Sequence, residues 1–254
     1  MAKIKVALQM ACFWHMQDQV ARDLQGTFKT IADMGYEGIE FAGYYGRSAE
    51  ELRAMLDEAG LEVAGTHIGL NTLLGDELEK TIEFNRILRN RFLIVPWLPE
   101  KMINSKEALL KTAKLFNEIA EKLKSEGMYV GYHNHHVEFK PMNGETPWDI
   151  FFKATVPEVV MQLDTGNAMY GGVTSDGLLE IIRKYPGRVK TVHLKEYSSK
   201  KGFLALLGEG DINWKKFLSL CETIGGTEWY IIEEEISPFD VAKYCLNNLR
   251  KMQQ

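Results

Sequence analysis

The stretch VMQLDTGNAMYGGVTSDGLLEIIRKYPGRVKTVHLKEY, residues 160–197, contains one strand–helix–strand unit. An apolar run over Val159–Asp164 leads into it, an amphipathic segment follows over Leu178–Tyr185, and a β-branched run over Val189–Leu194 completes it. Two strands joined through a helix lie parallel in one sheet, because the chain must cross back over the sheet between them. The stretch therefore predicts an α/β fold with a parallel sheet.

The same alternation continues in both directions along the chain. Short apolar runs predict eight strands, over Ile4–Gln9, Gly38–Phe41, Glu62–His67, Phe92–Pro96, Tyr129–His135, Val159–Asp164, Val189–Leu194 and Trp229–Glu235. Segments with a 3.6-residue apolar period predict helices over Leu24–Met34, Ala49–Ala59, Leu78–Arg89, Lys106–Ser125, Leu178–Tyr185, Trp214–Ile224 and Pro238–Met252. Eight such units close into a (β/α)8 TIM barrel, which takes roughly 250 residues.

An open, doubly wound sheet is the rival architecture for this pattern. In such a fold a Gly-rich, phosphate-binding turn commonly follows the first strand. Here the first strand is followed by ACFWHMQDQ, Ala11–Gln19, which has no glycine. No stretch rich in Pro, Gly or Ser divides the chain, so residues 1–254 are expected to form a single barrel domain.

Composition and charge narrow the function classes. The formal net charge of −5 gives no help in attracting a nucleic-acid backbone, so nucleic acid is not an expected partner. The cysteines, Cys12, Cys221 and Cys245, have no C-x-x-C spacing, which disfavours a disulfide framework. The first residues lack the apolar region of a signal peptide, and no apolar run reaches about 18 residues. We expect a cytoplasmic protein that binds a small molecule and no membrane, with outer helices that can support a homodimer.

Polar and charged residues end many of the predicted strands, at the level where a barrel gathers side chains around one ligand. Burying so many carboxylates and imidazoles is costly unless they share a partner, and a divalent cation is the simplest one. A set without thiolates suits Mn²⁺, Co²⁺, Zn²⁺ or Mg²⁺ and does not choose among them. The residues concerned are Glu40, His67, His133, His135, Glu138, Asp164, His193, Lys195 and Glu233 to Glu235.

Taken singly, each of the three strongest candidates has an ordinary explanation. Asp164 stands where an aspartate commonly caps the following turn. His193 could be a hydrogen-bonded core histidine, and Glu233 begins a run of three acids, which usually lies in solvent. The run follows directly on WYII, however, so strand alternation directs at least one of its carboxylates inward. The coincidence of all three residues at strand ends favours a shared metal site.

Seven short motifs occur in order over nearly the whole chain. They are GYEGIEFAGYYG (Gly35–Gly46), THIG (Thr66–Gly69), YHNHHVEF (Tyr132–Phe139), LDTGN (Leu163–Asn167), VHLKEY (Val192–Tyr197), GEGDINW (Gly208–Trp214) and WYIIEEE (Trp229–Glu235). As a set, they resemble the sugar phosphate isomerase/epimerase family of xylose-isomerase-like barrels, which also includes inosose dehydratases and, more distantly, endonuclease IV. The resemblance implies a barrel with one divalent metal ion at its mouth.

In that family the metal ligands come from the fifth to the eighth strands and are usually Glu, Asp, His and Glu. Asp164 matches the second ligand, His193 the third and Glu233 the fourth, with a shift to Glu234 or Glu235 left open by the run of acids.

The first ligand position departs from the family pattern. The common E-N-H reads His133-Asn134-His135 here, so a histidine replaces the first glutamate. In the family's ketose 3-epimerases the two glutamates are held to act from opposite faces of the substrate carbon. The departure therefore disfavours symmetrical epimerisation and favours isomerase or dehydratase chemistry at the same metal.

The resemblance implies a metal-dependent isomerase, epimerase or dehydratase that acts on a small sugar, keto-sugar or inosose through an enediolate. A metal that polarises a carbonyl stabilises the charge left when the α-proton departs. The expected metal ligands are Asp164, His193, Glu233 and His133. The expected catalytic residues are Glu233, His133, Glu138 and Lys195, and those expected to bind substrate are His67, Glu40, Trp14, Trp97, His135 and Lys195.

Two other functions stay open at this point. A barrel whose site is disabled by the histidine at 133 would bind a polyol without turnover. A phosphodiesterase that acts on abasic DNA, as in endonuclease IV, would use the spare histidines His67 and His135 for additional metal ions. The acidic charge and the lack of a basic loop stand against it.

Overall fold

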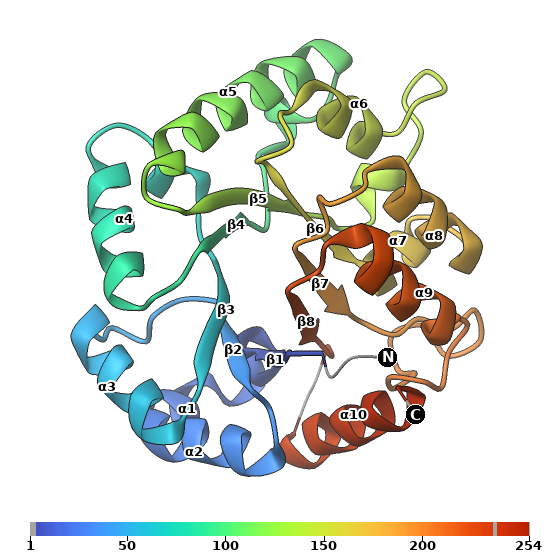
Figure 1. Ribbon diagram of the computed structural model, residues 1–254. Helices are drawn as coiled ribbons and strands as arrows, with labels where there is room; N and C mark the ends of the chain where they lie inside the picture. The colour runs from blue at the N-terminus through green and yellow to red at the C-terminus, as the bar shows by residue number, and fades with distance from the viewer. Residues whose placement is uncertain (1–3, 236–237, 254) are drawn as a thin grey trace.

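The strands form a closed barrel in which each runs parallel to its neighbours. The computed structural model describes residues 4–235 and 238–253. The strands follow one another around the barrel in chain order, and β8 pairs with β1 to close it. Figure 1 looks into this ring, with the helices outside. The predicted (β/α)8 barrel is confirmed. The strands are β1 (Val6–Gln9), β2 (Gly38–Phe41), β3 (Glu62–His67), β4 (Phe92–Val95), β5 (Tyr129–His133), β6 (Val160–Asp164), β7 (Thr191–Leu194) and β8 (Trp229–Ile232).

Helices cover the outside of the barrel. Their ends follow local sequence: Ser48 and Glu51 form a capping box at the start of α3, and Gly60 ends it with a left-handed φ of 73°. No helix in the described part of the chain is long and apolar enough to cross a membrane. The α-helices are α1 (Gln17–Arg22), α2 (Leu24–Met34), α3 (Ala49–Ala59), α4 (Glu77–Ile87), α5 (Lys106–Lys124), α6 (Pro147–Ala154), α7 (Thr165–Tyr170), α8 (Ser175–Lys184), α9 (Trp214–Leu220) and α10 (Phe239–Met252). Shorter helical turns are η1 (Met10–Met16), η2 (Leu70–Leu73), η3 (Glu100–Met102), η4 (Val137–Phe139) and η5 (Cys221–Gly225).

Three strands end earlier than the sequence pattern predicts, β4 by one residue at Val95 and β5 and β8 by more. Strand β5 ends at His133, because the backbone N–H of His135 donates to the Glu138 carboxylate at 2.8 Å and not to a neighbouring strand. Strand β8 ends at Ile232, so Glu233 lies in the segment that follows. The helices α1 and α7 were not predicted, since six residues are too few to show a 3.6-residue period.

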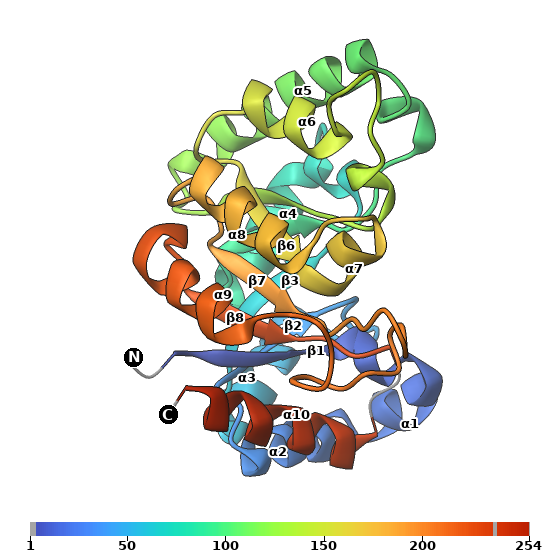
Figure 2. The same cartoon turned by 90° about the vertical axis from the view of Figure 1, so that its right-hand side faces the viewer.

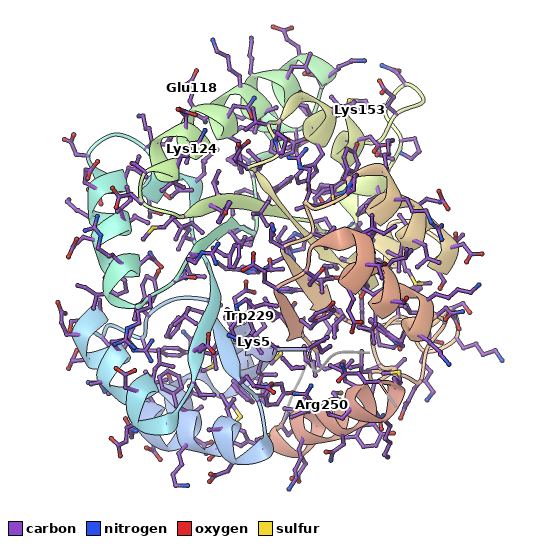
Figure 3. All side chains as sticks on the ribbon, in the orientation of Figure 1. Lys5, Glu118, Lys124, Lys153, Trp229 and Arg250 are labelled. Atoms are coloured by element: carbon purple, nitrogen blue, oxygen red, sulfur yellow. The ribbon has the colours of Figure 1, made fainter. Side chains whose placement is uncertain are left out.

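The two ends of the barrel interior differ in polarity. Near the amino ends of the strands the interior is filled by apolar side chains, and Lys5 lies against Trp229 there, with its Nζ 4.9 Å from the ring centre (Figure 3). Towards the carboxyl ends it is lined by Gln9, Glu40 and Gln162, all fully buried. The barrel is thus plugged at one end and polar at the other. The apolar layer consists of Ala7, Ala64, Phe92, Ile94, Val160, Trp229 and Ile231.

A buried arginine joins the segment after α6 to the start of β7. The Arg188 guanidinium donates to the carbonyl oxygens of Phe152, Val156 and Val159 at 2.8 to 2.9 Å and to Thr155 Oγ1 at 2.8 Å. Arg188 as a whole is only 8% exposed. Because these acceptors have little access to water, the side chain satisfies groups that would otherwise be costly to bury.

Replacing Arg188 with methionine is expected to lower the free energy of unfolding by about 3 kcal/mol, since several buried acceptors lose their donor together. Urea unfolding measures the change. Arg183→Met is the matched control, because Arg183 is half-exposed and pairs with Glu180, a surface contact expected to contribute about 0–1 kcal/mol. Equal losses in the two variants would contradict the role given to Arg188.

Candidate metal centre and active site

Four side chains that can hold a cation meet at the carboxyl ends of consecutive strands. His133 ends β5, Asp164 ends β6, His193 lies in β7 and Glu233 follows β8. Each offers one ligand atom, and these atoms all lie within 4.8 Å of one another. Asp164 and His193 are register partners, which places them at the same height in the barrel. The predicted metal ligands are therefore brought together as one cluster.

The polar atoms of this cluster are not matched among themselves. Asp164 Oδ1 caps α7 by accepting from the Asn167 N–H at 2.6 Å, but the buried Oδ2 has no hydrogen-bond partner among the residues that the structure describes. His193 Nδ1 lies 2.6 Å from Glu233 Oε2 and 3.9 Å from Asp164 Oδ2, yet it makes no well-directed hydrogen bond. Acceptor atoms this close together need a shared positive charge, which either a proton on His193 Nδ1 or a bound metal cation would supply.

Glu40 fixes the orientation of the His193 ring from the side that faces away from the cluster. His193 Nε2 donates to Glu40 Oε2 at 2.6 Å, so the lone pair of the neutral ring lies on Nδ1, which faces the cluster. Glu40 also accepts from Gln9 Nε2 at 2.6 Å and from Gln162 Nε2 at 2.7 Å. A carboxylate behind a metal-binding histidine commonly fixes its tautomer and ring orientation in this way.

The Gln162 side-chain oxygen orients two further histidines of the site. It lies 2.7 Å from His67 Nε2 and 3.1 Å from His133 Nδ1, so both rings can donate to it. A proton on His133 Nδ1 leaves its Nε2 as the lone-pair atom. Gln162 and Gln9 were missed by the sequence reasoning. Gln162 lies two residues before Asp164, and strand alternation, which puts i and i+2 on one face, could have found it.

Lys195 lies beside the cluster with little access to water. Its Nζ is 3.1 Å from Glu233 Oε1 and 2.6 Å from Glu235 Oε1, and its side chain is 6% exposed. Glu40, Asp164 and Glu233 are three carboxylates with little or no exposure, set against this one ammonium. These carboxylates outnumber the ammonium, and a divalent cation bound among the ligand atoms would offset the excess negative charge.

The pKa shifts of the cluster reflect the same imbalance. Burial raises the pKa of Asp164 to about 6, although Lys195 opposes the shift. Burial disfavours the imidazolium of His193, but Glu40 and Glu233 outweigh it and raise the pKa of that ring to about 10. Burial also acts against ionisation of Glu233, whose pKa is nevertheless held well below its usual range by Lys195 and His193. Without another cation, a proton on His193 balances the carboxylates around it.

Comparison with known proteins places this geometry in a family. The model of the xylose isomerase-like TIM barrel matches residues 28–252. The chain belongs to that family. A relative named inosose dehydratase, from Erwinia tasmaniensis, is 25% identical over 281 residues, with 94% of this chain and 93% of the relative covered.

Solved structures show the same fold. A sugar phosphate isomerase/epimerase from Parabacteroides distasonis has a TM-score of 0.78 at 23% identity, with 98% of this chain and 94% of that chain covered. An AP endonuclease of family 2 from Brucella melitensis has a TM-score of 0.71 at 17% identity, with 97% and 98% covered. At such identities the similarity concerns the xylose isomerase-like barrel and not the reaction.

Within this family barrel, the run of acids after β8 divides into three environments. Glu233 joins the metal cluster. Glu234 is 3% exposed and lies 3.2 Å from Cys245 Sγ, and its pKa is raised to about 8 by burial. Glu235 is half-exposed and pairs with Lys195. Among these three acids the structure therefore places Glu233 as the candidate ligand.

The other predicted site residues lie around the cluster at different depths. The buried Glu138 accepts from Tyr132 Oη at 2.7 Å and from the His135 N–H at 2.8 Å. The His135 ring centre lies 5.2 Å from that of His133. Trp14 and Trp97 follow β1 and β4 at the mouth, with 76% and 65% of their surface exposed. Glu40, predicted to bind substrate, is placed behind His193 and is fully buried.

Proposed function

We propose that the protein is a metal-dependent sugar isomerase, epimerase or dehydratase that acts on a small sugar, keto-sugar or inosose through an enediolate. Asp164, His193, Glu233 and His133 would hold one divalent ion, Mn²⁺, Mg²⁺, Co²⁺ or Zn²⁺. The observation that carries the proposal is the buried cluster itself, with four ligand atoms within 4.8 Å of one another and an Asp164 oxygen that has no hydrogen-bond partner among the described residues.

Such an ion, when bound, would stabilise negative charge on a substrate carbonyl oxygen. The chain's own residues supply the proton transfers. Glu233 Oε1, which contacts Lys195, is the best-placed carboxylate to take a proton from the carbon next to the carbonyl. The Lys195 ammonium can donate to an oxygen on which charge develops. Each carboxylate oxygen of Glu138 accepts a hydrogen bond from the protein. We therefore propose that Glu138 stabilises the chain at the end of β5 and takes no part in proton transfer.

The histidine at 133 makes the two faces of the site unequal. A carboxylate lies on the β8 side, whereas the β5 side presents His133 and His135, and burial lowers the pKa of both rings. An epimerase must remove a proton from one face and return it to the other with similar ease. The asymmetry suits reactions that return the proton to a neighbouring carbon or expel a β-hydroxyl as water, and the relatives named inosose dehydratase support the second of these.

The reaction class can be tested with a panel of keto-sugars and inososes in deuterated water, using protein loaded with Mn²⁺ or Co²⁺. Deuterium entering the carbon next to the carbonyl shows proton abstraction. A product with the same molecular formula as the substrate, apart from the deuterium label, indicates isomerisation or epimerisation. A product that has lost one water molecule indicates dehydration. Absence of label across the panel, with the metal bound, would favour a barrel that binds polyols without turnover. A failure to take up any divalent metal would contradict the proposal.

Lys195→Met is expected to slow deuterium exchange by about a hundredfold or more, since one donor to a developing oxyanion typically contributes that much to kcat. The rate is followed by NMR on whichever panel compound exchanges. Lys190→Met is the matched control, because Lys190 is outside the cluster and pairs with Glu228 at 3.6 Å. Similar rates in both variants and the parent would remove Lys195 from the catalytic group.

A phosphodiesterase that acts on abasic DNA is the weaker candidate. The structural similarity to an AP endonuclease concerns the fold, and the net charge of −5 does not favour DNA. Retention of the protein on abasic duplex DNA at low salt, combined with strand cleavage, would support it in place of the sugar reaction.

A further inference from the structure

One buried carboxylate joins the two sequence motifs that lie at either end of the β7–α9 loop. Glu196 belongs to VHLKEY and is 1% exposed. Its carboxylate accepts from the N–H of Tyr197 at 3.0 Å and, in the GEGDINW motif, from the N–H of Gly208 at 2.8 Å and from Trp214 Nε1 at 2.6 Å. One side chain therefore binds the beginning of the β7–α9 loop, its end and the first residue of α9.

The two ends of this loop are in close contact around Glu196. The Asp211 N–H donates to the Tyr197 carbonyl at 2.9 Å, and Asp211 Oδ2 accepts from the Ser199 N–H at 2.7 Å. A Cβ on Gly210 would lie 2.3 Å from the Tyr197 oxygen and 2.4 Å from Glu196 Oε1. Glycine at 210 permits this approach, which any side chain would block.

The clamped loop carries aromatic side chains to the edge of the metal cluster. Phe203, Tyr197 and Tyr170 form a triangle with ring centres 5.4 to 6.1 Å apart. Lys195 Nζ lies 5.1 Å from the Phe203 ring centre and 3.1 Å from Glu233. In Figure 2 the orange segment between β7 and α9 extends at the end of the barrel to which β1 points. Phe203 therefore lies against the Lys195 ammonium, next to the metal cluster.

We propose that Glu196 is a positioning residue, which clamps the ends of the β7–α9 loop and so holds Phe203 as a fixed apolar wall over Lys195. Closing a loop costs conformational entropy, and one carboxylate with three donors offsets it at a single point. The wall keeps water from the ammonium, which strengthens the contacts of Lys195 with nearby oxygens. The importance of this wall for catalysis rests on the proposed function, whereas the clamp itself does not.

Two readouts on the full chain separate the clamp from the wall. Lys200 and Lys201 lie in the loop and are trypsin sites, so cleavage after them reports how often the loop opens. Acetylation of Lys195 by acetic anhydride, measured by mass spectrometry against Lys190 in the same protein, reports how well the amine is covered. Glu196→Ala is expected to increase both the cleavage rate and the labelling, each by about tenfold. Phe203→Ala is expected to increase the labelling alone.

Leu204→Ala is the control, because Leu204 lies in the same loop and its side chain is exposed. Both readouts should stay near the parent's values in that variant. If Glu196→Ala does not fold, Glu196→Gln replaces it, since the amide keeps one acceptor oxygen and should give intermediate increases. A folded Glu196 variant cut and labelled at the parent's rates would overturn the proposal. Faster cleavage with unchanged labelling would overturn the wall over Lys195. Neither readout requires a metal or a substrate, so these failures are distinct from a failure of the sugar chemistry.

Discussion

Asp164→Asn is expected to lower the affinity for Mn²⁺ by about a hundredfold or more, equivalent to roughly 2.7 kcal/mol of binding free energy. Asparagine keeps the shape of the side chain and the oxygen that caps α7. It removes the charge and, with its one oxygen at the cap, places an amide N–H₂ where the buried Oδ2 now lies. A cation in the cluster would then lose a charged ligand at a position that water cannot readily reach.

Titration calorimetry or the electron paramagnetic resonance of Mn²⁺ measures this affinity. Asp176→Asn is the control, because Asp176 lies exposed in the first turn of α8 and makes the same change in net charge. The metal-free protein gives a second readout. Removing an unpaired buried carboxylate should leave the thermal stability of the metal-free Asp164→Asn variant equal to or above that of the parent. Parent-like Mn²⁺ affinity in the variant would place the metal elsewhere or exclude it.

The barrel and the members of the candidate metal cluster could be predicted from the sequence, because both follow from local patterns. Strand and helix periods are local, and a polar residue at the end of an apolar strand can be recognised without knowing its neighbours. Asp164 and His193 were found in this way. Glu233 could not be separated from Glu234 and Glu235 by pattern alone. The choice depends on where β8 ends, and the structure ends it at Ile232.

The hydrogen bonds that orient the cluster residues could not be predicted, because they join strands on different sides of the barrel. Gln162 contacts Glu40, 122 positions away in the chain, and His193 contacts Glu40 at a separation of 153. Glu40 was expected to bind substrate, because the resemblance to the family implied that role. Closure of the barrel instead puts it below His193, where the protein itself supplies its partners. The same holds for Glu138, whose partner Tyr132 is apparent only once the loop folds back.

Glu40→Gln is expected to weaken Mn²⁺ binding by about 10- to 100-fold, although Glu40 is not among the four candidate ligands. The glutamate accepts from three donors: Gln9, Gln162 and His193. A glutamine at this position has one acceptor oxygen and an N–H₂ group that must face one of those donors. If His193 loses its acceptor, the proton on Nε2 is no longer favoured, and the ring can place a proton on Nδ1, where the cation would bind.

The tautomer of His193 separates this mechanism from general damage. The ¹⁵N chemical shifts of its ring nitrogens in the parent loaded with diamagnetic Zn²⁺ should show the proton on Nε2, and the Glu40→Gln variant should show a mixture of tautomers. Glu62→Gln is the control, since Glu62 pairs with Lys5 at the opposite end of the barrel and its loss should change neither the affinity nor the shifts. Weakened binding with unchanged His193 shifts would mean that Glu40 acts through its charge. Unchanged binding would mean that packing alone orients the ring. Only a joint change in affinity and tautomer supports Glu40 as the residue that prepares His193 for a metal.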